Sequence, residues 1–271
     1  MAIKVSINCI TYNHEDYIED CLKGFLAQKT NFDFEVLIHD DASTDNTQEI
    51  IKRYEKEYPK IIKPIYQVEN QYSKGKIVSF DFNFPRAQGK YLAMCEGDDY
   101  WTDVNKLQKQ VDFLENNEDY SMCIHNAMKV SLFNGVKEPF NKNMVSQTIY
   151  PKDVILKSWF SPTASFLFRN NKLFKNTPKW EGANGDMILL FINATLGKIY
   201  YSNEIMSVYN LGTPSSLTKI RIKQPKLMFN KKMKLFYHFD KFTKGKYLPY
   251  TVFIRGKLVL GLLLRALKIR K

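Results

Sequence analysis

The chain has 271 residues, of which 44% are hydrophobic and 14% aromatic, and it carries a formal net charge of +12. This size fits one large α/β domain, alone or with an appendage, and the apolar content excludes an intrinsically disordered chain. We expect no secretory signal, because the N-terminus lacks an apolar core, and no membrane span, because the longest apolar run covers only residues 258–264.

The basic charge is confined to the last fifth of the chain. Residues 221–271 contain 15 Lys or Arg and one acid, Asp240, which gives a net charge of +14. Residues 1–220 contain 25 basic and 27 acidic residues, which gives −2. The body therefore has the charge of an ordinary globular domain, and the tail is a separate electrostatic element.

Strand and helix patterns alternate through the first 100 residues. Short β-rich or apolar runs predict strands at residues 4–10, 34–39, 61–67 and 91–95. Helical periodicity over residues 17–26 and 50–58, with a further helix before Gly89, places a helix between successive strands. The order β-α-β-α-β-α-β predicts an α/β fold, with a mainly parallel central sheet and helices on both faces.

The rest of the chain is less regular. Helices are predicted at residues 105–116 and 186–195, strands at 121–130 and 163–168, and a loop at 133–150. The cysteines have no CxxC spacing and the histidines no metal-ligand spacing, so we expect buried thiols and structural imidazoles. These residues are Cys9, Cys21, Cys95, Cys123, His14, His39, His125 and His238.

Two adjacent carboxylates, Asp98 and Asp99, follow the predicted strand at residues 91–95. Ligands of open α/β sheets bind where strands end, and paired carboxylates repel each other unless a cation compensates them. A divalent cation that holds a diphosphate is suited to this role, because Mg²⁺ is typically bound by one or two carboxylates and substrate phosphates. An Asp-rich surface turn is the alternative interpretation.

Further acidic residues stand at comparable positions. Asp40 and Asp41 follow the strand at residues 34–39, and Asp186 opens the helix at residues 186–195. With a parallel sheet, these groups and the Asp98–Asp99 pair are expected to face one cleft.

The chain resembles glycosyltransferase family 2, whose members are inverting enzymes with the GT-A fold. The resemblance covers about residues 3–215. The matching segments are SINCITYN at 6–13, VLIHDDASTDNT at 36–47, AQGKY at 87–91 leading into EGDD at 96–99, and Gly185-Asp186.

The resemblance implies transfer of a sugar from a nucleotide diphosphosugar, with a UDP-sugar expected, to an acceptor hydroxyl. Asp99 would bind Mn²⁺ or Mg²⁺, and Asp186 would deprotonate the acceptor, a glycan or a lipid-linked saccharide. The residues implied in nucleotide-sugar binding are Thr11, Asn13, Asp41 and Asp98.

The resemblance also implies a division of the chain. Residues 1–99 are expected to form the nucleotide-sugar-binding half of the GT-A domain, and residues 100–220 the acceptor-binding half. Residues 221–271 would form a basic, partly amphipathic helical tail. Tyr100 and Trp101 are candidates for the acceptor site, with a place in the core as the alternative.

Several of these assignments have a second interpretation. Asp40 and Asp45 fit helix caps, and Asp186 fits a first-turn acid that complements the helix dipole. Lys74 and Lys76 either contact the diphosphate or lie in a solvated loop, which the sequence favours.

One segment departs from the family pattern. Many members carry a basic residue near an aromatic one after the helix of the base, but residues 207–217 (SVYNLGTPSSL) contain no Arg, Lys or His. The groups that close over the diphosphate are therefore expected to be uncharged or to lie further along the chain. The candidates are Asn210, Thr213, Ser215, Ser216, Lys219 and Arg221.

The tail favours an anionic membrane surface over nucleic acid, because it is rich in Leu and Val as well as cations. Packing on the domain with the charges in solvent is a further possibility. We expect a cytoplasmic enzyme of polysaccharide or glycolipid synthesis, peripheral at the inner face of the membrane. The alternatives are a sugar nucleotidyltransferase, disfavoured because residues 8–16 contain no Gly, and a nucleic-acid-binding module that uses the tail.

Overall fold

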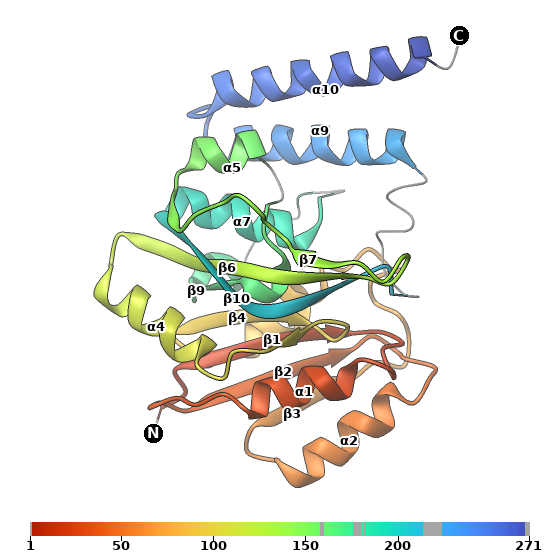
Figure 1. Ribbon diagram of the computed structural model, residues 1–271, viewed down its shortest axis with the longest axis vertical. Helices are drawn as coiled ribbons and strands as arrows, with labels where there is room; N and C mark the ends of the chain where they lie inside the picture. The colour runs from red at the N-terminus through yellow and green to blue at the C-terminus, as the bar shows by residue number, and fades with distance from the viewer. Residues whose placement is uncertain (1, 158–159, 176–179, 181–182, 214–223, 269–271) are drawn as a thin grey trace.

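A ten-stranded mixed sheet forms the centre of the molecule (Figure 1). The computed structural model describes residues 2–157, 160–175, 180, 183–213 and 224–268. The strand order is β3-β2-β1-β4-β9-β6-β10-β5, with β7 paired to β6 and β8 paired to β10. The strands are β1 (Val5–Thr11), β2 (Phe34–Asp40), β3 (Ile62–Tyr66), β4 (Tyr91–Glu96), β5 (Tyr100–Trp101), β6 (Tyr120–Ser131), β7 (Lys137–Pro139), β8 (Gln147–Ile149), β9 (Leu167–Arg169) and β10 (Lys198–Leu211).

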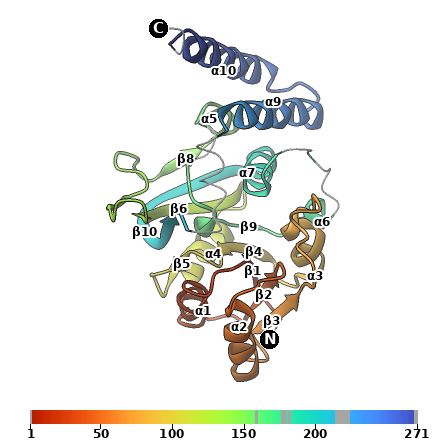
Figure 2. The same cartoon turned by 90° about the vertical axis from the view of Figure 1, so that its right-hand side faces the viewer.

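Helices lie on both faces of this sheet (Figure 2). The longer ones are α1 (Ile18–Leu26), α2 (Thr47–Glu57), α4 (Lys106–Asn116), α7 (Gly185–Leu196), α9 (Pro225–Phe242) and α10 (Leu248–Lys268). The short ones are the π-turn η1 (Ser79–Asn83), α3 (Phe84–Arg86), α5 (Pro151–Lys157), the 3₁₀ turn η2 (Thr163–Ser165) and α6 (Lys172–Lys175).

The parallel half of the sheet has the arrangement that the sequence predicts. β1 pairs in parallel with β2 and β4, and β2 pairs in parallel with β3. β6 and β10 form another parallel pair, while β5, β7, β8 and β9 pair antiparallel with their neighbours. The sheet is thus parallel where the helix-strand alternation is regular and mixed beyond β4.

Each face has its own apolar core. On one face, α1, α2 and α4 bury residues such as Phe25, Ile51 and Leu107 against the sheet. On the other face, α3, α7 and α9 bury residues such as Phe84, Phe191 and Phe239. Burial of apolar surface on both sides holds the central strands in a fixed register, and this register sets the positions of the loops at the strand ends.

Beyond β4, two predicted elements differ from the structure. Residues 163–168 are not one strand, because the amide of Ser165 donates to the Pro162 carbonyl and closes a turn before β9 begins. Residues 133–150 are not all loop, because β6 and β10 recruit residues 137–139 and 147–149 as short antiparallel strands. The second difference arises from tertiary pairing, which local sequence patterns do not report.

The basic tail consists of two helices with different surroundings. α9 is part of the body, because Phe236 and Phe239 are fully buried and contact the ring of Phe191 on α7. α10 lies outside α9 and forms the outermost layer (Figure 2). Among the described helices, none combines the length and apolarity that a membrane span requires.

Candidate active site

The carboxyl ends of three parallel strands meet at one edge of the sheet, on the right in Figure 1. Thr11 of β1 is level with Asp40 of β2, and Ile10 of β1 is level with Glu96 of β4. The loops that follow these strands therefore emerge side by side. They bring together Asp41, Asp98 and Asp99, which the sequence places far apart.

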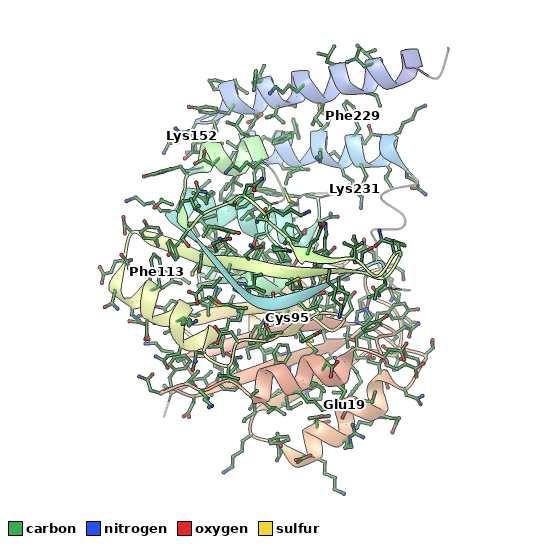
Figure 3. All side chains as sticks on the ribbon, viewed as in Figure 1. Glu19, Cys95, Phe113, Lys152, Phe229 and Lys231 are labelled. Atoms are coloured by element: carbon green, nitrogen blue, oxygen red, sulfur yellow. The ribbon has the colours of Figure 1, made fainter. Side chains whose placement is uncertain are left out.

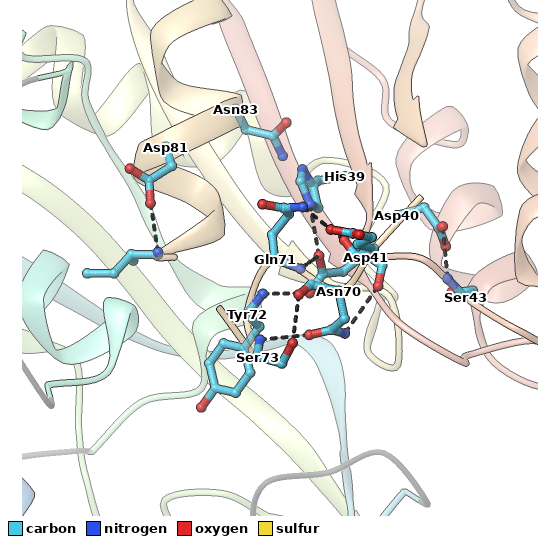
Figure 4. Close-up of polar contacts among 12 residues, drawn as sticks. His39, Asp40, Asp41, Ser43, Asn70, Gln71, Tyr72, Ser73, Asp81 and Asn83 are labelled. Carbon is cyan, nitrogen blue, oxygen red and sulfur yellow. Dashed lines mark hydrogen bonds and ion pairs between the residues drawn. The ribbon is translucent and has the colours of Figure 1, made fainter. Parts of the chain in front are cut away.

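The carboxylates at the end of β2 accept several hydrogen bonds (Figure 4), although Asp40 Oδ1 is buried without a partner among the described residues. Asp41 is almost fully buried, and its carboxylate accepts the backbone amides of Gln71 at 2.7 Å and Tyr72 at 3.0 Å. Asp40 accepts the backbone amide of Ser43 at 3.1 Å and the side-chain amide of Gln48. These carboxylates fix the loops around them, and Asp41 keeps lone-pair capacity for one further donor.

The loop after β1 is tied to the loop after β2 through Asn13. Asn13 has φ of 54°, in the left-handed region that Asn tolerates better than most residues. Its Oδ1 accepts the Thr44 amide at 2.8 Å, and its own amide donates to Ser43 Oγ at 2.9 Å. This clamp leaves the neighbouring Tyr12 ring exposed at the site edge. The sequence reasoning above missed Tyr12, although an aromatic residue beside a loop Asn was the available signal.

The end of β4 is bound on one side by the end of β10. Asp98 accepts the Thr213 hydroxyl at 2.8 Å, and Asp99 accepts the Asn210 backbone amide at 2.9 Å. The side-chain amide of Asn210 donates to the Asp98 carbonyl at 2.7 Å. Asn210 and Thr213 therefore contact the Asp98–Asp99 pair. Both are uncharged candidates from residues 207–217, the segment that lacks Arg, Lys and His. Ser215, Ser216, Lys219 and Arg221 lie outside the described residues.

Gly97 lets the end of β4 approach β1 closely. A Cβ atom at this position would lie 2.7 Å from Thr11 Oγ1 and 3.1 Å from His14 Nδ1. Thr11 is fully buried and lies within hydrogen-bonding distance, 3.2 Å, of His14 Nδ1. Thr11 and His14 thus pack against the loop that carries Asp98 and Asp99.

The carboxylate pair lacks a compensating cation among the described residues. Burial, followed by the charges of Asp98 and Glu96, raises the pKa of Asp99 well above its usual value. His14 Nε2 lies 3.8 Å from Asp98, but burial lowers the pKa of His14, which favours the neutral imidazole. No Lys or Arg in the described part of the chain pairs with either carboxylate.

This donor set fits a divalent cation that is shared with a substrate. Within the described residues, no group of three or more His, Cys, Asp or Glu side chains is placed to hold a metal ion. Mg²⁺ and similar ions do not need such a group when phosphate oxygens and waters complete the shell. A cation bound to a diphosphate would neutralise the Asp98–Asp99 pair, and this is the kind of group that the site fits.

Asp186 lies in the first turn of α7, and its Oδ1 accepts the amide of Met187 at 2.8 Å. A Cβ atom on Gly185 would lie 3.3 Å from a methyl carbon of Ile77, so this turn packs beside η1. η1 is in turn joined to β1 by the bond from Asn8 to Ser79, at 3.1 Å. The start of α7 therefore borders the sheet on the face opposite α1.

Three other sequence assignments are resolved by the contacts. The amide of Thr47 donates to Asp45 at 3.0 Å, which favours a structural role at the start of α2, although the N-cap residue itself is Asn46. Lys74 forms an exposed ion pair with Glu69, which favours a solvated loop. The four cysteines are free and buried, as expected.

Trp101 is a core residue, and its predicted place at the acceptor site is not supported. Its side chain is 3% exposed, and the indole nitrogen donates to the Ala164 carbonyl at 2.9 Å. The ring contacts Phe25 edge-on and carries the Lys106 ammonium 3.9 Å from its centroid. Tyr100 is only half-buried and keeps its proposed role.

Comparison with known proteins places this site in a family. Residues 6–176 match the model of glycosyl transferase family 2, which covers more than half of the chain. The chain belongs to glycosyltransferase family 2. An uncharacterized protein of Mycobacterium tuberculosis is 38% identical over 208 residues, which cover 76% of this chain and 58% of the relative. The family assignment favours the transferase over the nucleotidyltransferase and nucleic-acid-binding alternatives.

A second relative is named for its activity. The UDP-Glc:alpha-D-GlcNAc-diphosphoundecaprenol beta-1,3-glucosyltransferase WfaP of Escherichia coli is 33% identical over 111 residues, which cover 41% of each chain. The chain thus spans little more than half the length of one relative and less than half of the other.

Solved structures show that the fold is GT-A. Staphylococcus aureus TarS 1-349 in complex with UDP-GlcNAc aligns with a TM-score of 0.63 at 21% identity, over 86% of this chain and 66% of that one. The mannosyltransferase PcManGT of Pyrobaculum calidifontis, in complex with GDP-Man and Mn²⁺, gives 0.61 at 18% identity, over 86% and 64%. At these identities the likeness supports the architecture, which the family assignment also implies.

Proposed function

We propose that the protein transfers a sugar from a nucleotide diphosphosugar, with a UDP-sugar favoured, to an acceptor hydroxyl in polysaccharide or glycolipid synthesis. The observation that carries the proposal is the Asp98–Asp99 pair, which has no cation partner among the described residues and lies beside Asp41 at the sheet edge. Similar proteins support this choice, since TarS is bound to UDP-GlcNAc and WfaP is a UDP-Glc-dependent glucosyltransferase.

The donor's nucleotide is proposed to lie along the ends of β1 and β2. Asp41 has remaining acceptor capacity for an N–H of the base, and the exposed Tyr12 ring offers a surface on which a base can stack. Thr11 and Asn13 shape this loop, and Asp98 is proposed to hold the ribose.

The diphosphate is proposed to lie against Asp99 together with Mn²⁺ or Mg²⁺. When bound, the cation would stabilise the charge that develops on the diphosphate as the sugar leaves. The backbone amide of Asn210 holds the Asp99 carboxylate in place, and the Thr213 hydroxyl does the same for Asp98.

The reaction is proposed to proceed with inversion through Asp186. The carboxylate removes the proton of the acceptor hydroxyl, the acceptor oxygen bonds to the anomeric carbon, and the bond from that carbon to the diphosphate oxygen breaks. A positioned base of this kind contributes roughly 10²–10⁴-fold in rate. The location of Asp186 in the first turn of α7 also stabilises its anionic form.

Thermal shift with a panel of nucleoside diphosphates and their sugars, with and without Mn²⁺, tests the donor and the metal. We expect a UDP compound to raise the melting temperature, and Mn²⁺ to increase that shift. An absence of any shift with the whole panel would contradict the proposal. The Asp186→Asn variant should keep the nucleotide shift but lose transfer by roughly 10²–10⁴-fold, and unchanged turnover would remove Asp186 from the mechanism.

We further propose that the enzyme works peripherally at the anionic inner face of the cell membrane, through α10. The inner side of α10 is held by α9, because Arg255 forms an ion pair with Asp240 and Thr251 donates to Asp240 at 2.7 Å. α10 carries side chains on its outer side, away from the rest of the molecule (Figure 3). The exposed apolar residues of α10 form a stripe. The stripe comprises Val252, Phe253, Val259, Leu260, Leu263 and Leu264.

Charge supports a membrane as the occupant of this stripe. The region from residue 221 onward has a net charge of +14, which attracts anionic lipids at about 1 kcal/mol per cation near the surface. The Leu260→Ser/Leu264→Ser double variant should lose co-flotation with phosphatidylglycerol vesicles, while Val68→Ser, exposed on the loop after β3, should not. Equal flotation of all three proteins would refute the membrane contact. Deletion from residue 221 is unsuitable, because it would remove core residues of α9.

A further inference from the structure

The hairpin between β6 and β7 carries an apolar tip that the proposed function does not use. Ser131 and Val136 close the tip, with the Ser131 amide donating to the Val136 carbonyl at 2.9 Å. Leu132, Phe133 and Val136 are exposed by 43%, 52% and 44%. A tip of this composition costs solubility unless it has a binding role, so its position is informative.

This tip lies beside the carboxylate pair. The amide of Leu132 donates to the Leu211 carbonyl at 2.9 Å, which attaches the hairpin to the end of β10. The Phe133 ring covers Gly212, where a Cβ atom would lie only 2.6 Å from the nearest ring carbon. The next residue, Thr213, donates to Asp98. Figure 1 shows the hairpin turning next to the end of β10, at the edge of the sheet where β1 and β4 also end.

Gly212 makes this arrangement possible. It has φ of 93°, which L side chains rarely adopt, and any side chain would displace the Phe133 ring. Phe133 is 52% exposed with this contact in place, so part of the residue stays accessible to solvent.

We infer that Phe133 is the platform on which a saccharide ring of the acceptor packs. A pyranose has an apolar C–H face that an aromatic ring can cover, while its hydroxyl edge stays free to react or to form hydrogen bonds. The inference rests on the proposed function, since it assigns the acceptor side of the same site.

The sheet order separates Phe133 from the proposed nucleotide side. Asp41 and residues 70–73 stand at the end of β2, whereas Phe133 stands at the end of β6, with β1, β4 and β9 between these strands. Asp98 and Asp99 lie between the two regions. A donor that spans from Asp41 to Asp99 thus presents its sugar toward the hairpin.

The test combines saccharide binding with a donor measurement on the full chain. A glycan array that includes diphospholipid-linked GlcNAc and polysaccharide repeats is probed in the presence of UDP and Mn²⁺. Phe133→Ala should weaken binding to the saccharides that the wild type selects by about tenfold, and Phe133→Trp should retain binding. Tyr237→Ala is the matched control, because Tyr237 is an aromatic residue of similar exposure, 49%, on α9 and outside the apolar stripe of α10.

The donor measurement keeps the two proposals distinct. The UDP-induced thermal shift should be the same in Phe133→Ala and the wild type, because Phe133 is assigned to the acceptor alone. The inference is overturned if the wild type binds no saccharide on the array, or if Phe133→Ala binds saccharides as well as the wild type does. It is also overturned if Phe133→Ala loses the UDP-induced thermal shift. A normal UDP shift together with either of the first two outcomes would leave the donor proposal standing.

Discussion

The ends of β2 and β4 carry adjacent carboxylates at the same edge of one sheet, yet their surroundings differ. At the end of β2, Asp40 and Asp41 receive backbone and side-chain amide donors from the loops after β2 and β3 and from Gln48 in the first turn of α2. At the end of β4, Asp98 and Asp99 receive a hydroxyl and a backbone amide, and burial and mutual repulsion raise the pKa of Asp99.

This difference separates two uses of the same residue type. Carboxylates whose donors come from the protein are stable without a ligand, so the β2 pair shapes the loops of the site. Carboxylates that lack compensation gain most from a bound cation, so the β4 pair is the place where a metal–diphosphate would contribute. Counting acidic residues alone would not distinguish the two pairs.

The largest expected effect comes from removing a carboxylate at the end of β4. Asp99→Ala should lower transfer by roughly 10²–10³-fold, because charge on the departing diphosphate loses its stabilisation. Calorimetry should show that Mn²⁺ no longer strengthens UDP binding. The free protein should keep its stability or gain some, because the substitution removes a buried and uncompensated acid.

The matched change at the end of β2 should have the opposite profile. Asp41→Asn should destabilise the protein by about 1–3 kcal/mol, because one of the amides of Gln71 and Tyr72 would face a donor NH₂ group. In the Asp41→Asn variant, Mn²⁺ should still strengthen UDP binding. Equal loss of stability in the two variants would erase the distinction between the two strand ends.

Lys106 extends the comparison to a buried cation. Burial lowers its pKa to about 7, and among the described residues its ammonium donates to Gln110 and lies over the Trp101 ring. Between pH 7 and the ordinary lysine pKa near 10.5, the unfolded chain binds more protons at this residue than the folded chain. The free energy of unfolding should therefore rise with pH, by up to about 1.4 kcal/mol per pH unit from this group.

Denaturant titrations at a series of pH values measure this slope. Lys106→Met should reduce the slope between pH 7 and 10, and it should stabilise the protein most near pH 7 and below. Lys23→Met, at an exposed position on α1, is the control and should leave the slope as in the wild type. A slope unchanged by Lys106→Met would mean that the ammonium is compensated in solution.

The sequence predicted the parallel half of the fold because its signals are local. Apolar runs, helix periodicity and the residues at strand ends are read directly from residues 4–99, and the observed elements match them closely. The exception is the segment before Gly89, where Pro85 interrupts the pattern and a π-turn and a single helical turn replace the expected helix.

Features that depend on contacts between residues far apart in the chain could not be predicted from local sequence signals. Trp101 looks the same in sequence whether it faces a ligand or Phe25, and only the packing of α1 on β5 decides. α9 and α10 are both basic and apolar, yet the Phe236–Phe239 pair is buried while the stripe on α10 is exposed. The place of Phe133 likewise depends on a contact with Gly212, nearly 80 residues away.

The smallest expected effect concerns the backbone of the β2 end. Ala42 has φ of 65°, a conformation that costs an L residue about 1–2 kcal/mol and costs glycine almost nothing. Ala42→Gly should relieve this strain, and the greater freedom of the unfolded chain should offset about 0.4–1 kcal/mol of the gain. A net rise in melting temperature of about 1–2 °C is expected. Ala27→Gly, where φ is −74°, should lower it instead. If both variants lower it equally, the loop after β2 relaxes in solution, and the hydrogen bonds to Asp40 and Asp41 do not hold its backbone in the strained conformation.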